Sequence, residues 1–140
     1  DDVVSRSVTV DMEAGTRTVR LHDAQGRVVE ETVFNDDTPV AEVFYQYDET
    51  GLREKRRRAG GVRERWSYER AEDGTLVQTE YAVDGSIRKR TVYEEGDTWH
   101  EELYRRGQAF LRVYYVNEVK TKEEFLRDGT VFRVKELETE

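Results

Sequence analysis

Glycine recurs in this chain at a fixed interval, and that interval limits the fold more than any other feature of the sequence. In the C-terminal half the spacing is eleven residues, with Glu118 standing where the series skips one glycine. Each unit is rich in Val, Thr, Tyr, Phe and Trp and closes on a turn-forming pair. Such a unit predicts one β-strand of about nine residues and a tight turn. The glycines of the series are Gly74, Gly85, Gly96, Gly107 and Gly129.

The N-terminal half carries the same pattern at looser spacing, with units that end at Gly26, Asp37, Gly51 and Gly61. Over 140 residues the pattern predicts an all-β fold, an antiparallel meander of about twelve strands in a single domain, 1–140. Because 36% of the residues are hydrophobic and 39% charged, we expect an extended, single-layer or coiled sheet without a thick core. A closed up-and-down barrel is the structural alternative.

A two-residue turn also predicts the register of its hairpin, because residues that face each other across it have numbers with a constant sum. Turns at Glu95-Gly96, Arg106-Gly107 and Asn117-Glu118 would build an alternating row of charge across four strands. Facing opposite charges each stabilise a sheet by about 0.2 to 1 kcal/mol. The predicted pairs are Arg90 with Glu101, Glu101 with Arg112, Arg112 with Glu123, Arg20 with Glu31 and Arg57 with Glu64.

Composition narrows the classes of partner. The formal net charge of −8 disfavours a nucleic-acid binder, which needs Lys and Arg to neutralise phosphates. The absence of Cys excludes disulfides, thiolate zinc sites and a cysteine nucleophile. No apolar run reaches the roughly 20 residues of a membrane-spanning helix, so no transmembrane segment is predicted. The chain begins Asp1-Asp2 without Met, so we expect a processed or excised segment from which a lipid anchor could have been lost.

Residues 47–53, which read Tyr-Asp-Glu-Thr-Gly-Leu-Arg, resemble the YD repeats of Rhs-type bacterial proteins. A related form follows at residues 81–87, and the whole chain is also similar to MORN-type repeats and to the bacterial antitoxins that carry them. The resemblance implies a β-hairpin repeat with a shell, scaffold or binding role. It supplies no catalytic residue.

A basic cluster around the Gly60-Gly61 turn is the first candidate for an interaction patch. It could receive a phosphate, an acidic protein or a membrane surface, whereas in the structural interpretation the neighbouring acidic strands neutralise it. If any patch binds a partner, we expect this one to do so. Its residues are Arg53, Lys55, Arg56, Arg58, Arg63, Arg65 and Trp66.

Other chemical groups favour a structural interpretation. His22 and His100 are expected on opposite faces, and the acidic turns at residues 35–37 and 94–97 lack the alternating ligand spacing of a calcium loop. We therefore predict no metal site, cofactor or catalytic residue. Several aromatic side chains could form a binding platform, but their strand spacing is typical of cross-strand packing: Trp66, Tyr68, Trp99, Tyr114 and Tyr115.

The sequence predicts a non-enzymatic structural or protein-interaction module, part of a bacterial envelope or surface protein, with an extracytoplasmic location favoured over a cytoplasmic one. We expect it to use a sheet face or an open edge, where Lys135, Glu136 and the final Glu-Thr-Glu look like edge protection. Two alternatives stay open. One is a β-barrel that binds a ligand inside, and the other is an antitoxin or immunity protein that masks a basic partner with its acidic surface.

Overall fold

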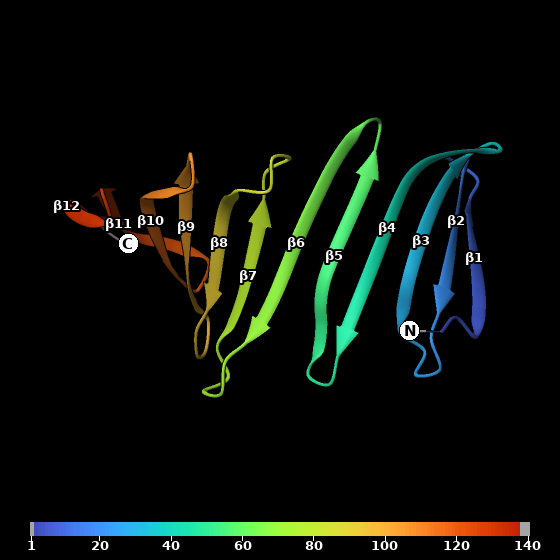
Figure 1. Ribbon diagram of the computed structural model, residues 1–140, viewed down its shortest axis with the longest axis horizontal. Helices are drawn as coiled ribbons and strands as arrows, with labels where there is room; N and C mark the ends of the chain where they lie inside the picture. Colours follow the sequence, from blue (N-terminus) through green and yellow to red (C-terminus); the bar gives the residue numbers. More distant parts are fainter. Residues whose placement is uncertain (1, 138–140) are drawn as a thin grey trace. The chain divides into compact units, whose positions relative to one another are not determined.

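The computed structural model describes residues 2–137, which contain twelve β-strands and no helix (Figure 1). Each strand is hydrogen-bonded to its neighbours in the sequence, in the order β1 to β12. The predicted all-β antiparallel meander of about twelve strands is confirmed. The strands are β1 (Ser5–Asp11), β2 (Thr16–His22), β3 (Val28–Asn35), β4 (Thr38–Asp48), β5 (Gly51–Ala59), β6 (Val62–Arg70), β7 (Leu76–Tyr81), β8 (Ile87–Tyr93), β9 (Thr98–Arg105), β10 (Gln108–Val116), β11 (Val119–Arg127) and β12 (Thr130–Glu136).

The chain divides into two compact units, 1–65 and 66–140, and the division falls within β6. Inside each unit, the described strands contact only strands adjacent in the sequence, so each unit is a single layer of sheet. Over residues 2–137, β1 pairs with β2 alone and β12 pairs with β11 alone. The closed barrel is therefore wrong, because closure needs a ladder between the first and last strands. The prediction of one domain over 1–140 stays a prediction.

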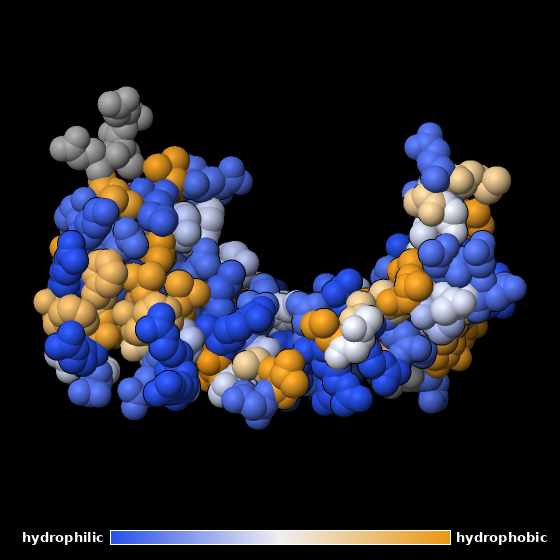
Figure 2. All heavy atoms as spheres, turned by 90° about the horizontal axis from the view of Figure 1, so that it is seen from above, coloured by the Kyte–Doolittle hydropathy of each residue, from blue (hydrophilic) through white to orange (hydrophobic). Residues whose placement is uncertain are grey.

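Neither unit has a conventional hydrophobic core. The buried hydrophobic side chains are Val29 and Val43 in the first unit and Val113 and Leu126 in the second, and no described side chain is fully enclosed. On the side of the molecule drawn in Figure 2, hydrophobic side chains lie scattered among hydrophilic ones. Contacts between neighbouring strands must therefore supply most of the stabilisation, at about 0.2 to 1 kcal/mol for each favourable side-chain pair.

The turns of the C-terminal glycine series are of two kinds. Arg106-Gly107, Asn117-Glu118 and Asp128-Gly129 are two-residue turns in which both residues have positive φ, as the glycine series predicts. Glu118 adopts φ 68° in the place that glycine holds elsewhere. The turns at residues 83–85 and 95–97 contain one residue more. Each is closed by an N–H to C=O bond between the two residues that flank it, from Ala82 to Ser86 at 2.8 Å and from Glu94 to Thr98 at 2.9 Å. The two-residue turns expected there are therefore wrong.

A β-bulge follows the turn in seven hairpins. In each, one residue of the second strand has no partner in the first, and it lies three positions beyond the last residue of the turn. A bulge of this kind increases the local twist and moves all later pairs by one residue. The bulge residues are Val29, Val40, Arg53, Arg88, Phe110, Thr121 and Phe132.

The bulges correct the predicted register of the C-terminal strands. Arg90 faces Glu102, Glu102 faces Arg112, and Arg112 faces Glu124, so the three predicted pairs with Glu101 and Glu123 are wrong by one residue. The cause is the additional turn residue between β8 and β9 together with the bulges at Phe110 and Thr121. The alternating row of charge still forms, because the sequence carries Glu doublets at residues 101–102 and 123–124.

The predicted pair of Arg20 and Glu31 is confirmed, with Arg20 Nε 3.6 Å from the Glu31 carboxylate. Here the turn after β2 also contains one residue more than predicted, and the bulge at Val29 moves the pairing back by one. Two deviations therefore cancel in this hairpin. In the three ladders from β8 to β11, a single deviation is left uncompensated in each.

Candidate interaction surfaces

The predicted basic patch lies on β5 and β6, and its cations are largely paired. Arg53 approaches the Asp48 carboxylate at 3.7 Å, and Arg56 Nε lies 3.2 Å from Glu54. Arg58 forms an ion pair with Glu42 on the neighbouring strand β4. The structure therefore places carboxylates beside the basic residues of β5, as the structural interpretation expects.

The remaining residues of the basic patch differ in the contacts that they make. Lys55 Nζ lies 5.9 Å from the ring centre of Tyr45, and Arg65 Nη1 lies 3.5 Å from Glu54. Arg63 is exposed and forms no ion pair with any residue in the range 2–137. Trp66 begins the second unit, whereas the other patch residues belong to the first. A binding role for this patch stays a prediction.

The predicted pair of Arg57 and Glu64 is confirmed, at 2.7 Å across the turn between β5 and β6. Both side chains are partly exposed to solvent. Exposed pairs of this kind contribute at most about 1 kcal/mol each, because water screens them. Their main effect is to leave few free cations for a partner.

The second unit carries the alternating charge row Arg90–Glu102–Arg112–Glu124 across β8 to β11. Arg112 is its centre, with Nε 2.8 Å from Glu102 and Nη1 3.5 Å from Glu124. The Arg90 guanidinium lies 4.0 Å from Glu102. Tyr104 and Tyr114 donate hydroxyl hydrogen bonds to Glu102 and Glu124 respectively. Each carboxylate therefore has both a cation and a phenol as partners.

These contacts hold the carboxylates ionised. Burial opposes ionisation of Glu102, but hydrogen bonds from Tyr104 and Arg112 and the charges of Arg112 and Arg90 outweigh it and lower its pKa. The hydrogen bond from Tyr114 lowers the pKa of Glu124. Burial, together with the hydrogen bond to Glu102 and its charge, raises the pKa of Tyr104 to about 12. Both carboxylates of the row are therefore ionised at neutral pH.

The structure shows cross-strand contacts for Trp99, Tyr114 and Tyr115 and for both histidines. Trp99 stacks on Tyr115 with ring centres 5.0 Å apart and planes at 10°, and His100 lies against Tyr114 at 5.3 Å. His100 Nδ1 is 2.7 Å from Glu94, whereas His22 is bonded to Ser7 and to the Gly26 carbonyl. These contacts fit packing within the sheet, as expected for aromatics at strand spacing.

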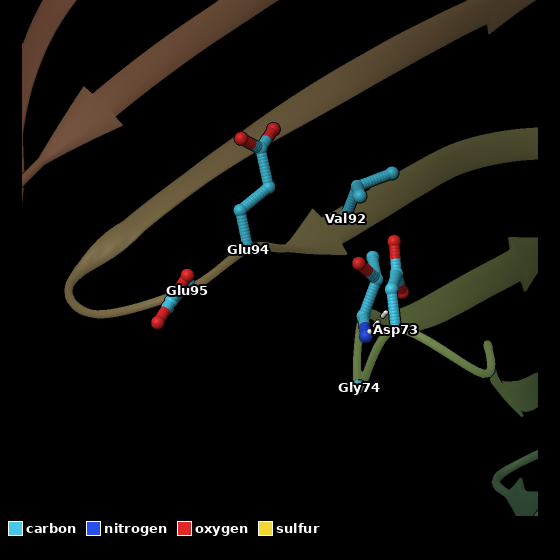
Figure 3. Close-up of a pocket in the computed structure, with 6 residues that line it drawn as sticks. Asp73, Gly74, Val92, Glu94 and Glu95 are labelled. Atoms are coloured by element: carbon cyan, nitrogen blue, oxygen red, sulfur yellow. Dashed lines mark hydrogen bonds between the residues drawn. The ribbon is translucent and has the colours of Figure 1, made fainter.

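An open depression of about 710 Å³ lies between the turns that follow β6 and β8 (Figure 3). In Figure 3 the side chains of Glu94 and Glu95 diverge, and Asp73 Oδ1 is already bonded to the Thr75 N–H at 2.9 Å. Over residues 2–137, no group of three or more His, Asp or Glu side chains is placed to hold a metal ion. The lining residues are Asp73, Gly74, Thr75, Val92, Glu94 and Glu95.

The sheet edges leave hydrophobic side chains uncovered. All seven residues of β1 are exposed, including Val8 at 47% and Val10 at 57%. On β12, Phe132 is 54% and Val134 50% exposed. Backbone N–H and C=O groups on the outer side of an edge strand have no partner in the sheet, which makes such strands templates for pairing.

Sequence reasoning singled out the basic patch and missed the edge valines. The available signal was the composition of β1, which alternates Val with Ser and Thr and has one basic residue and no Pro. Edge protection was expected at Lys135, Glu136 and the final Glu-Thr-Glu. Lys135 and Glu136 are exposed on β12, and residues 138–140 lie outside the described residues.

No family model matches the chain, and no curated protein matches it. The similarity to YD and MORN-type repeats and the bacterial envelope setting therefore stay predictions. In the part of the chain that the structure describes, no helix is long and apolar enough to cross a membrane.

Proposed function

We propose that this chain is a non-enzymatic protein-interaction module that binds its partners by strand pairing at the edges of its sheet. The observation that carries the proposal is β1, an edge strand exposed along all seven residues and paired on one side only. An added strand would complete its backbone hydrogen bonds and cover its valines. This is the mode of β-augmentation, in which the backbone supplies affinity and alternate side chains supply specificity.

The faces of the sheet are less suited to binding. Their charged side chains already pair with one another, as Arg112 does with Glu102 and Glu124, and Arg58 with Glu42. A partner on a face would have to displace these pairs or bury them. At an edge, a partner gains backbone hydrogen bonds that the isolated molecule makes only to water.

Site-specific photo-crosslinking in the native cell tests this function. A photoreactive amino acid replaces Val8 on β1, Val134 on β12 or, as the control, Val83, which is 81% exposed in the turn between β7 and β8. We expect discrete protein adducts from positions 8 and 134 and none from position 83. Equal adducts from all three positions, or none from the edges, would contradict the proposal.

A further inference from the structure

The outer residues of the two edge strands complement each other. We infer that β12 of one molecule pairs antiparallel with β1 of a second copy, so that the sheet of one molecule continues into the next. The inference rests on the proposed edge-pairing function and names its partner. The observation behind it is the match of Arg6 and Val8 on β1 with Glu136 and Val134 on β12.

One register satisfies both matches. Side chains alternate along a strand, so Arg6 and Val8 point to one face of the sheet, and Val134 and Glu136 also share a face. When Val8 stands opposite Val134, antiparallel pairing brings Arg6 opposite Glu136. Both valines are about half exposed in the single molecule, so their contact removes apolar surface from water.

The charges at this junction are available for a partner. Within residues 2–137, neither Arg6 nor Glu136 forms an ion pair, in contrast to most cations of β5. On the other face, the cations of β12 meet hydroxyl side chains and no like charge. Those facing positions are Lys135 with Ser7 and Arg133 with Thr9.

Pairing of like edges is less favourable. Two copies of β12 paired about a two-fold axis at Val134 bring Arg133 of each strand opposite Lys135 of the other, and an axis at Arg133 brings the two Arg133 side chains together. Two copies of β1 leave Arg6 without an acidic partner, because Asp11, the acid within the strand, lies on the opposite face. Charge therefore favours the pairing of unlike edges.

A junction of unlike edges is heterologous, and after each addition the assembly still has one free β1 edge and one free β12 edge. Assembly then continues beyond two copies and grows with concentration. Such growth separates this arrangement from a two-fold dimer, which stops at two copies.

Edge-blocking variants test the inference by sedimentation velocity of the full chain over a range of concentrations. Val8→Lys blocks β1 and Val134→Lys blocks β12, because a lysine at the centre of an edge opposes strand addition. We expect the unmodified chain to form species beyond the dimer and each variant alone to stay monomeric. An equimolar mixture of the two variants should form a dimer and nothing larger, since only one productive pair of edges remains.

A charge exchange tests the register. Arg6→Glu or Glu136→Arg alone should weaken assembly about three- to tenfold, and the double variant should restore it. Circular dichroism and thermal melting confirm that each variant folds. Val83→Lys, in the exposed turn between β7 and β8, is the matched control and should assemble as the unmodified chain does.

Three outcomes overturn the inference: a chain that stays monomeric at all concentrations, a variant mixture that stays monomeric, or a Val8→Lys variant that assembles alone. Failure of the underlying function is distinguishable from these. Crosslinks from positions 8 and 134 to other proteins, with no self-assembly, would leave edge binding intact and remove only the second copy as its partner.

Discussion

At the scale of single residues, the turns show how strongly local conformation depends on side-chain type. Gly107 and Glu118 occupy the second position of equivalent two-residue turns, with φ 78° and 68°. Left-handed conformation costs a residue with a Cβ atom roughly 1–2 kcal/mol, and glycine avoids this cost. Glu118 therefore carries strain that the repeat elsewhere relieves with glycine.

We expect Glu118→Gly to raise the free energy of unfolding by up to about 1 kcal/mol, and Gly107→Ala to lower it by about 1 kcal/mol. No heavy atom of a non-neighbouring residue lies within 4 Å of a Cβ built on Gly107, so the second effect isolates backbone strain from steric clash. Urea unfolding of both variants measures the change. If both variants changed the free energy of unfolding in the same direction, the two turns would differ in more than φ.

Glu102 gives a prediction about pH. Its folded pKa lies below its unfolded value near 4.5, so its contribution to stability is present above pH 4.5 and is lost as the pH falls through the folded pKa. We expect Glu102→Gln to lower stability by about 1–3 kcal/mol at pH 7 and to flatten the loss below pH 4.5. Unfolding curves between neutral and acidic pH measure both effects. An unchanged acid profile in the variant would assign the loss to other carboxylates.

At the scale of strands and hairpins, the bulge after each of seven turns is the feature that the sequence did not reveal. The strands and the glycine-containing turns could be predicted, because the hydrophobic alternation and the Gly spacing are local signals. A bulge such as the one at Phe110 has no comparable signal in a single sequence, since Phe is equally at home in a regular strand. The register error followed directly from this.

The missing sequence signal for bulges also limits what could be predicted about the basic patch. The pair of Arg57 and Glu64 was predictable from one turn, because the two residues lie equally far from the Gly60-Gly61 turn in the sequence. The contact of Arg53 with Asp48 depends on a bulge residue and could not be read from the spacing. The exposed valines of β1 were visible in the sequence, but their exposure depends on β1 being an edge.

Deleting single residues of β10 should distinguish the bulge from the regular ladder. Removing Phe110 leaves every other pair of β9 and β10 in place and loses mainly its contact with Arg105, so we expect a cost of about 1–2 kcal/mol. Removing Val113 shifts part of the strand to the wrong face and should unfold the hairpin. Thermal melting compares the stability of the two deletion variants. Val113→Ala is the control, because it removes the valine side chain without shortening the strand. Equal damage from both deletions would contradict a separable bulge.

At the scale of the whole molecule, stability should be local, because each strand contacts only its sequence neighbours within a unit. We expect Val43→Ala to reduce amide hydrogen-exchange protection in the first unit alone, and Val113→Ala in the second alone, since each removes a buried side chain. Hydrogen exchange measured by mass spectrometry reports the protection of each unit separately. Loss of protection throughout the chain from either change would indicate one cooperative unit.

The bulge that follows the turn also bears on how such a chain could evolve. Because a hairpin such as β9–β10 contains its own turn and its own bulge, duplication of such a complete hairpin would add strands without disturbing the pairing of those already present. Duplication of one strand alone would reverse the direction of every strand after it and exchange the faces of their side chains. Lineages built from this unit should therefore gain and lose strands in pairs.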